Sequence, residues 1–303
     1  PMRVRFIHKG EFRLRPFVYP YIREINMETF KTTLKEDKEN PVPIKFFVEG
    51  YEYSFLGLFS SNIHLFGTGN EEVPINLLGT DKLGRDIFSR ILYGARISLS
   101  IGLIGVMISF IIAIVLGGVA GYYSGWIDEI IQRGMELLRS IPTLPLWMAL
   151  GAAFPKDWSI IQNYFAITII LSLIGWTGLG RDIRSKFLSL RDEDFIISAK
   201  ISGRTDFEII YMHMLPSFMS HIIASLTLAI PYMIIGETSL SFLGVGLRPP
   251  VVSWGVLLQQ AQKVQVVANQ PWLMFPGLFV VLTVLAYNFL GDGLRDAADP
   301  YST

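Results

Sequence analysis

The chain has 303 residues, of which 51% are hydrophobic and only 17% are charged, and its mean hydropathy is +0.42. This composition is too apolar for an ordinary soluble domain and places most of the chain in lipid. The formal net charge is zero, so charge gives no argument for nucleic acid as a partner. The sequence contains no cysteine, which excludes disulfides, thiolate metal sites and a cysteine nucleophile.

Residues 1–77 predict a small folded segment outside the membrane. Residues 12–19 and 44–53 alternate or cluster aromatic and branched side chains, as strands do, and the charged run 35–40 separates them. No run within residues 1–60 is long enough to cross a bilayer or resembles an export signal. The sequence also opens at Pro1 and not at an initiator methionine. We therefore expect the native protein to have an earlier transmembrane helix ahead of this sequence.

Residues 78–97 begin with a turn and then predict an amphipathic helix. Thr80 or Asp81 is expected to cap this helix. Asp86 and Arg90 are four residues apart and therefore share one face, while apolar residues occupy the other. We expect this helix to lie in the membrane interface before the chain enters the bilayer.

Five runs approach the twenty apolar residues that a helix needs to cross the hydrocarbon. Pro142 and Pro145 interrupt the second run, which predicts a kink there. Gly117, Gly121 and Gly125 share i, i+4 spacing, which predicts a smooth helix face for close packing. The expected spans are residues 98–122, 135–154, 160–178, 216–245 and 272–290.

Positive charge in the loops predicts the orientation of the chain. The connector at residues 179–215 is rich in lysine and arginine, whereas the loops around Lys156 and from Arg248 to Lys263 are poor in them. The connector is therefore expected to be cytoplasmic. Counting spans from it puts residues 1–77 on the extracytoplasmic side and the C-terminus in the cytoplasm.

The cytoplasmic connector contains a polar, helix-prone hairpin between two apolar runs. Residues 194–202 predict a short helix, and Gly203 provides the left-handed residue that ends a helix without strain. Thr205 and Glu208 have the spacing of a capping box, so a second helix is expected to begin there. A short rigid helix between two stops is the result.

This hairpin resembles the EAA motif of the membrane-spanning subunits of bacterial ABC importers, in which an acidic-Ala-Ala triplet, a glycine and a later Leu-Pro mark the coupling helix. Here Ile197 and Ser198 replace the acid and the first alanine, so the resemblance implies docking through helix shape and apolar contact. The helix is expected to seat in a groove of an ATP-hydrolysing subunit and to transmit its closure. The residues expected to take part are Asp194, Ile197, Ser198, Ala199, Lys200, Gly203, Arg204 and Thr205.

Further stretches resemble the second permease subunit of dipeptide and oligopeptide ABC importers. They are Leu-Gly-Thr-Asp-x-Leu-Gly-Arg-Asp at 78–86, Gly-Ala-Arg-Ile-Ser-Leu at 94–99, Glu-Thr-Ser-Leu-Ser-Phe-Leu-Gly-Val-Gly at 237–246, Ser-Trp-Gly at 253–255 and Asn-Phe-Leu-Gly-Asp-Gly-Leu-Arg-Asp-Ala at 288–297. The resemblance implies an all-α transmembrane bundle of the type I importer class, residues 98–303, with a strand-containing extracytoplasmic segment.

The same resemblance implies a set of partners. It predicts a multi-pass subunit of a bacterial or archaeal inner membrane, paired with a homologous second permease and driven by two ATP-binding subunits or domains that hold ATP and magnesium. A binding protein is expected to deliver peptides to the outer face, and residues 1–77 either help to receive it or form a solvated cap. A non-peptide solute such as nickel or a sugar is the alternative substrate.

The sequence itself contains no motor and no catalytic constellation. It has no G-x-x-x-x-G-K-[ST] phosphate loop, no G-x-S-x-G elbow and no zinc signature, so we expect a subunit that is not an enzyme and binds no cofactor of its own. A secondary transporter is the less favoured alternative, because it would show inverted repeats and matched intramembrane charges, which this sequence lacks.

Glu237 is the one acidic residue deep within an apolar run. An ionisable group there suggests either a transport path or a hydrogen bond between helices. Because hydroxyl residues surround it in the sequence, we favour the structural hydrogen bond and keep the path as a hypothesis. Pro142 and Pro231 are candidate hinges or gates.

Overall fold

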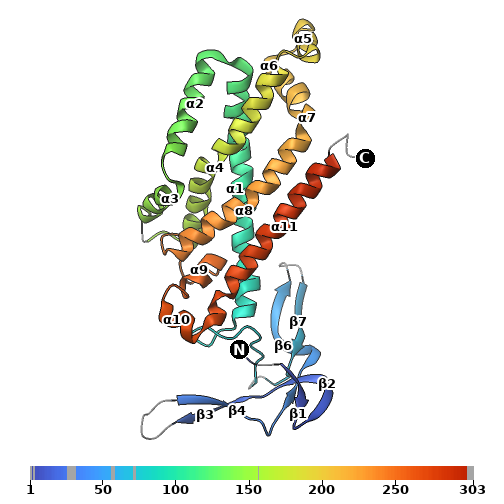
Figure 1. Cartoon of the computed structure of the whole chain (residues 1–303), viewed down its shortest axis with the longest axis vertical. Helices are drawn as coiled ribbons and strands as arrows, with labels where there is room; N and C mark the ends of the chain where they lie inside the picture. Colours follow the sequence, from blue (N-terminus) through green and yellow to red (C-terminus); the bar gives the residue numbers. More distant parts are fainter. Residues whose placement is uncertain are drawn as a thin grey trace. The chain divides into compact units, whose positions relative to one another are not determined.

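The computed structural model describes residues 2, 4–25, 32–55, 59–70, 73–155 and 157–298. It divides into two compact units, residues 1–90 and 91–303. The N-terminal unit holds the strands and the C-terminal unit is helical (Figure 1). Lys156, in one of the loops that are poor in positive charge, lies outside the described residues.

The N-terminal unit contains short antiparallel sheets, as the aromatic and branched runs predicted. β1 pairs with β2 and β2 with β5, whereas β3 pairs only with β4, and β6 only with β7, among the described strands. The strands are β1 (Arg5–His8), β2 (Glu11–Val18), β3 (Tyr21–Ile25), β4 (Thr32–Glu36), β5 (Val42–Pro43), β6 (Lys45–Phe55) and β7 (Phe59–Gly67).

A small aromatic core holds β1 against β2. The side chain of Phe17 is 1% exposed, and its ring contacts the rings of His8 and Tyr19. His8 Nδ1 lies 2.8 Å from the Tyr19 hydroxyl, and burial lowers the pKa of His8 below its ordinary value. A neutral imidazole therefore suits this contact.

The turn before the first helix differs from the sequence expectation. The helix starts at Ile87, not near residue 80, because Gly79 and Gly84 take positive φ angles of 81° and 77° that end any helical path. Asp86 caps the helix by accepting a hydrogen bond from the Ser89 amide at 2.7 Å. Residues 87–97 are the start of one long helix and form no separate interfacial helix.

Asp81 organises this turn instead of capping the helix. Its carboxylate accepts hydrogen bonds from the amides of Leu83 and Arg85 and from the guanidinium of Arg85, at 2.8–3.0 Å. Arg90 also donates to it at 2.6 Å and so pairs with Asp81. Burial favours the neutral acid, but the hydrogen bonds from Arg85 and Leu83 outweigh it and lower the pKa of Asp81.

Four described helices have the length and apolar character to cross a membrane: Ile87–Tyr123, Ile160–Leu190, Met219–Phe242 and Pro271–Ala297. The helical elements are α1 (Ile87–Tyr123), α2 (Gly125–Ser140), α3 (Thr143–Ala152), α4 (Ile160–Leu190), α5 (Asp194–Ile201), α6 (Asp206–Glu208), the π-helix η1 (Ile209–Met214), α7 (Leu215–Ser217), α8 (Met219–Phe242), α9 (Trp254–Gln259), α10 (Val264–Asn269), the 3-10 helix η2 (Pro271–Met274) and α11 (Phe275–Ala298).

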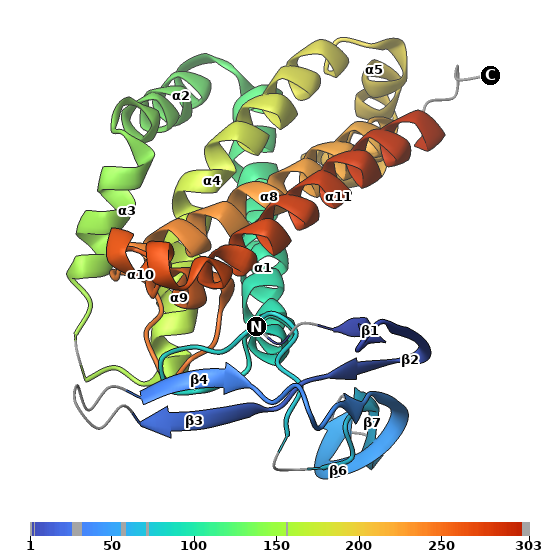
Figure 2. The same ribbon diagram turned by 60° about the horizontal axis from the view of Figure 1, so that its bottom comes forward.

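The expected span at residues 135–154 is wrong as a single helix. α2 ends at Ser140, and both Ile141 and Pro142 are extended, with ψ of 127° and 123°. A residue before proline avoids the helical region, so Pro142 stops α2, and its fixed φ then suits the position just before α3. Figures 1 and 2 show α2 and α3 as successive helices along one side of the bundle.

Close contacts between backbones hold α1 against α4. A Cβ placed on Gly117 would lie 2.4 Å from the carbonyl oxygen of Gly180, and one on Gly121 would lie 2.7 Å from the carbonyl oxygen of Arg184. These two glycines therefore form the smooth face that the sequence predicted. Gly125 follows the end of α1 with φ of 61° and is not part of that face.

Candidate functional site

The connector between α4 and α8 forms the hairpin that its local signals predicted. α5 ends where Gly203 takes a φ of 75°. Thr205 accepts a hydrogen bond from the amide of Glu208 at 3.3 Å, and the Glu208 carboxylate accepts one from the amide of Thr205 at 2.9 Å, which completes the capping box. The hydrogen bonds from the Thr205 backbone and side chain lower the pKa of Glu208.

A π-helical turn, which the sequence pattern did not predict, joins the hairpin to α8. Residues 209–214 adopt this wider turn directly before Leu215 and Pro216. In a regular α-helix the Pro216 ring would clash with the carbonyl of Met212, so the wider turn gives the proline room. Phe218 then leaves the helical region, with φ of −130°, before α8 begins.

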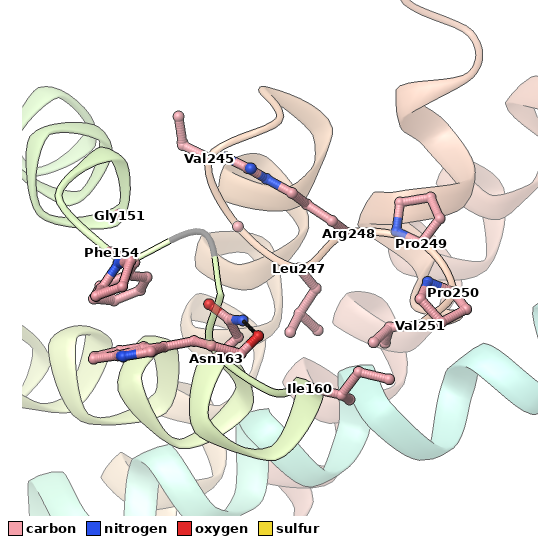
Figure 3. A pocket seen from close by; sticks show the side chains of 13 residues that line it. Gly151, Phe154, Ile160, Asn163, Val245, Leu247, Arg248, Pro249, Pro250 and Val251 are labelled. Carbon is pink, nitrogen blue, oxygen red and sulfur yellow. Dashed lines mark hydrogen bonds between the residues drawn. The ribbon is translucent and has the colours of Figure 1, made fainter.

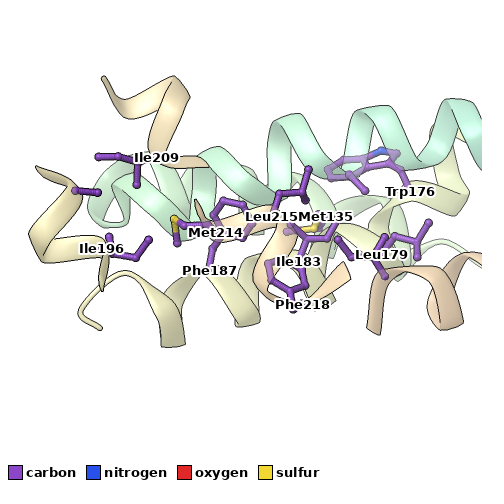
Figure 4. Close-up of a cluster of buried hydrophobic side chains, with 13 residues drawn as sticks. Met135, Trp176, Leu179, Ile183, Phe187, Ile196, Ile209, Met214, Leu215 and Phe218 are labelled. Carbon is purple, nitrogen blue, oxygen red and sulfur yellow. The ribbon is translucent and has the colours of Figure 1, made fainter. Parts of the chain in front are cut away.

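One face of α5 packs into a buried apolar cluster of the helical unit (Figure 4). Ile196 and Ala199 are 0% and 7% exposed, and they point toward the cluster. In Figure 4, Ile196 lies beside Met214 and Phe187, which come from η1 and α4. The residues that follow α5 are held by the same cluster through Ile209. The hairpin is therefore fixed to the bundle by its inner face.

The other face of α5 is exposed and carries both apolar and polar side chains. Ile197 is 42% exposed and Ile201 82%. Asp194, Ser198, Lys200 and the turn at Gly203 to Thr205 are exposed as well, so most of the residues expected to couple lie on the surface and only Ala199 is turned inward. Phe195 and Phe207, which no sequence motif marked, are 43% and 69% exposed. Their signal was the pairing of large apolar side chains with acids in a polar loop.

Asp206 ties the hairpin to the end of α1. Its two carboxylate oxygens accept hydrogen bonds from the hydroxyls of Tyr122 at 2.7 Å and Tyr123 at 3.0 Å. The Lys200 ammonium lies 5.3 Å from the centroid of the Tyr122 ring, within the range of a cation–π contact. The two hydrogen bonds join residues more than 80 positions apart, so no local sequence pattern could have indicated them.

Glu237 lies on α8 and is fully buried. Its Oε1 accepts hydrogen bonds from the hydroxyls of Ser241 and Ser253, both at 2.8 Å. Its Oε2 accepts one from Ser98 on α1 at 3.1 Å and a longer one from Thr238 at 3.5 Å. We call these five residues the Glu237 cluster.

The three serines of the Glu237 cluster satisfy backbone amides in turn. Ser98 accepts from the amide of Trp254 at 3.1 Å, and Ser241 accepts from that of Leu247 at 3.0 Å. Ser253 accepts from the amide of Val256 at 3.2 Å. Non-helical backbone at membrane depth needs such partners. The cluster thus binds the loop after α8 to α1 and α8, which favours the structural hydrogen bond over a transport path.

The two candidate gate prolines occupy different surroundings. Pro142 is exposed at the break between α2 and α3, whereas Pro231 is buried within α8. Only the Pro142 position interrupts a helix in the structure. Neither position forms a ligand site by itself.

A cavity of about 220 Å³ lies at the end of α4 that is remote from the hairpin (Figure 3). The loop from α3 to α4 and the loop after α8 form its walls. Phe154, Trp158 and Leu247 are among its apolar lining residues, and Asn163 and Arg248 contribute polar groups. No group of three or more histidines, cysteines or acids capable of holding a metal occurs among the described residues.

Residues 113–301 match the sequence family described as the binding-protein-dependent transport system inner membrane component. The chain is 40% identical over 223 residues to the dipeptide transport system permease protein of Bacillus subtilis, covering 73% of this chain and 68% of the relative. It is 42% identical over 223 residues to the glutathione transport system permease protein of Pectobacterium atrosepticum, covering 74% and 72%. For the oligopeptide transport system permease protein of Haemophilus influenzae the identity is 38% over 226 residues, covering 74% and 70%.

Solved structures agree on the fold. The inward-facing MetNI methionine ABC transporter matches with a TM-score of 0.56 over 70% of this chain and 98% of that chain, at 14% sequence identity. At such a low sequence identity, the match supports a conclusion about the fold alone. The expected all-α membrane bundle of the type I class, with strands in the N-terminal segment, is thereby confirmed.

Proposed function

The chain belongs to the family of binding-protein-dependent transport system inner membrane components. We propose that it is the permease subunit of an ATP-driven importer of di- or oligopeptides. The observation that carries the proposal is its identity of about 40% with dipeptide, oligopeptide and glutathione permeases over most of the chain. The chain then forms half of the translocation pathway, and a homologous second permease forms the other half.

The exposed face of α5 is the proposed docking site for the ATPase subunit. Residues 194–205 combine an exposed apolar surface, at Ile197 and Ile201, with an inner face that is buried in the bundle. A helix held in this way moves with the bundle, so closure of the ATPase dimer is transmitted as a rigid-body motion. The partner ATPase subunit binds ATP and magnesium, and this chain supplies the coupling helix.

The proposed orientation puts the hairpin and the C-terminus in the cytoplasm. The N-terminal segment, residues 1–77, then lies outside, on the side where a binding protein delivers substrate. In this orientation the cavity of about 220 Å³, at the end of α4 remote from the hairpin, lies toward the extracytoplasmic side of the helical unit. The distribution of lysine and arginine between the loops supports this arrangement.

The coupling proposal is tested by ATP hydrolysis in the reconstituted complex, with and without binding protein and peptide. Gly203 has φ of 75°, which proline cannot adopt, so Gly203→Pro should misplace α5 and abolish stimulation by the loaded binding protein. Gly203→Asn is the matched control, because asparagine tolerates this conformation.

The expected result is stimulated hydrolysis in the wild type and in Gly203→Asn, and only basal hydrolysis in an assembled Gly203→Pro complex. Unchanged stimulation in Gly203→Pro would mean that the hairpin joint does not transmit the motion. Uptake assays with peptide, nickel and sugar in the same vesicles test the substrate class, and accumulation of a solute other than peptide would contradict the peptide assignment.

A further inference from the structure

One face of the β1–β2 pair is apolar and exposed. Ile7 pairs with Phe12 across the two strands, and Leu14 lies two residues further along β2, on the side to which Phe12 points. These three side chains are 62%, 70% and 89% exposed. The ring of Phe6 stacks on that of Phe12, with 6.4 Å between their centroids. We call Phe6, Ile7, Phe12 and Leu14 the Phe12 face.

The opposite face of the same strands carries the buried aromatic core. Phe17 is 1% exposed there, and the Arg13 guanidinium lies 5.8 Å from the centroid of its ring. The core therefore fixes the strands from behind and leaves the Phe12 face pointing outward. An exposed apolar patch of this kind is typical of a surface that binds protein or lipid.

Positive charge surrounds the Phe12 face. Residues 5–18 contain four basic side chains and one acidic side chain. Lys9 occupies the turn between the strands, and Arg13 and Arg15 flank Leu14 in the sequence. The attraction of these cations for negative charge extends over about 8 Å at physiological ionic strength. They therefore act on any anionic surface that the apolar side chains touch.

The β6–β7 pair lacks this charge pattern, although it also has exposed aromatic side chains. Phe46, Phe47 and Tyr51 on β6 are 69–73% exposed. Glu49 and Glu52 lie between or beside them, and the acids of β6 outnumber its single lysine. An anionic surface would repel these acids. Charge therefore favours the Phe12 face as the part of the N-terminal unit that meets such a surface.

The chain itself ties this unit to a bilayer. Residues 68–86 join β7 to α1, which is long and apolar enough to cross a membrane. A surface on such a tether meets the bilayer at a high effective concentration. A weak attraction, too weak to recruit a free domain, is then sufficient to hold the Phe12 face on lipid.

We propose that the Phe12 face docks on the anionic lipid surface of the membrane that the helical unit crosses. The rings of Phe6 and Phe12 lie at the level of the headgroups, where aromatic side chains are favoured, and Leu14 reaches the upper acyl chains. Lys9 and Arg15 are attracted to lipid phosphates. The proposal goes beyond import and holds whichever solute the permease carries.

A single fluorescent label reports whether this face touches lipid. Because the chain has no cysteine, Leu14→Cys with cysteine-free partner subunits gives one labelling position, and its high exposure makes the change tolerable. Glu39→Cys is the matched control, since Glu39 is exposed between β4 and β5, outside the Phe12 face. Each variant carries a nitrobenzoxadiazole dye, whose emission shifts to the blue in an apolar environment.

The assembled complex is placed in nanodiscs of phosphatidylcholine alone or mixed with anionic phosphatidylglycerol. Each lipid is used with and without brominated acyl chains, which quench the dye on contact. In the anionic nanodiscs the dye at position 14 should be blue-shifted and quenched by brominated lipid. The dye at position 39 should show neither effect. Phosphatidylcholine alone should give weaker quenching at position 14.

Substitutions in the labelled Leu14→Cys chain then separate charge from apolar contact. Lys9→Gln and Arg15→Gln should each lower the ratio of lipid-bound to free label by about fivefold in anionic nanodiscs. Lys38→Gln is the charge control, because Lys38 is exposed outside residues 5–18 and should leave the ratio unchanged. Phe12→Ser should lower the ratio in both lipids.

Three outcomes would overturn the proposal. The first is quenching at position 14 that is no stronger than at position 39. The second is a blue shift at position 14 without quenching by brominated lipid, including one that appears only when the binding protein is added, because protein would then cover the face. The third is quenching that is equal in the two lipids and survives removal of both cations, which would leave no role for anionic lipid.

Discussion

Glu237 shows how one buried acid holds the segment after α8 against α1 and α8. Its two carboxylate oxygens accept hydrogen bonds from the hydroxyls of three serines, and each serine hydroxyl accepts a hydrogen bond from a backbone amide. Glu237→Ala would leave these hydroxyls without an acceptor, at a cost of about 1–3 kcal/mol for each buried group. We expect a clear fall in the melting temperature of the assembled complex, measured by scanning fluorimetry in detergent.

Glu237→Gln separates structure from transport at the same position. The amide keeps one acceptor oxygen and places an NH₂ donor against hydroxyls, so we expect a smaller loss of stability and unchanged peptide uptake per folded complex. Glu129→Gln on α2, where the side chain is 71% exposed, is the control and should change neither property. Loss of uptake in Glu237→Gln at unchanged stability would instead place this acid in the translocation path.

At the scale of the element, the hairpin is held by two independent contacts, the buried face of α5 and the carboxylate of Asp206. Asp206→Ala removes both tyrosine hydrogen bonds but leaves the capping box at Thr205 intact. At about 1 kcal/mol for each bond, the loss of two weakens attachment to α1 by roughly thirtyfold. We expect stimulated ATP hydrolysis to continue, with fewer peptides transported for each ATP.

The ratio of transported peptide to hydrolysed ATP is the measurement for Asp206, because a merely local loss of stability would lower both rates together. Asp192→Ala is the control, because that side chain is 78% exposed just before α5 and its ion pair is with the neighbouring Arg191. Tyr123→Phe, which removes one bond, should lie between the wild type and Asp206→Ala. An unchanged ratio in Asp206→Ala would show that α5 packing alone transmits the motion.

Across the whole molecule, sequence patterns predicted those structural features, such as helix caps and apolar helices, that depend on residues close together in the chain. Gly203 and the Thr205–Glu208 spacing located the hairpin, because caps act within one turn. Hydropathy located the lipid-facing parts of four helices, but it could not show that α4 continues to Leu190, since polar residues 181–190 are helical too. The partners of Asp206 and Glu237 are brought together by tertiary packing, up to 139 residues apart, and the sequence of one chain does not reveal them.

Close contact between the backbones of α1 and α4 is expected to couple the movement of these two helices. A Cβ on Gly117 would lie 2.4 Å from a backbone oxygen of α4, whereas one on the adjacent Gly118 would make an ordinary contact, 3.5 Å from the Phe187 ring. Gly117→Ala should therefore push the helices apart and cost about 1–3 kcal/mol, which lowers the melting temperature and the stimulated ATP hydrolysis. Gly118→Ala should leave both unchanged, and equal behaviour of the two variants would show that transmission does not require this close contact.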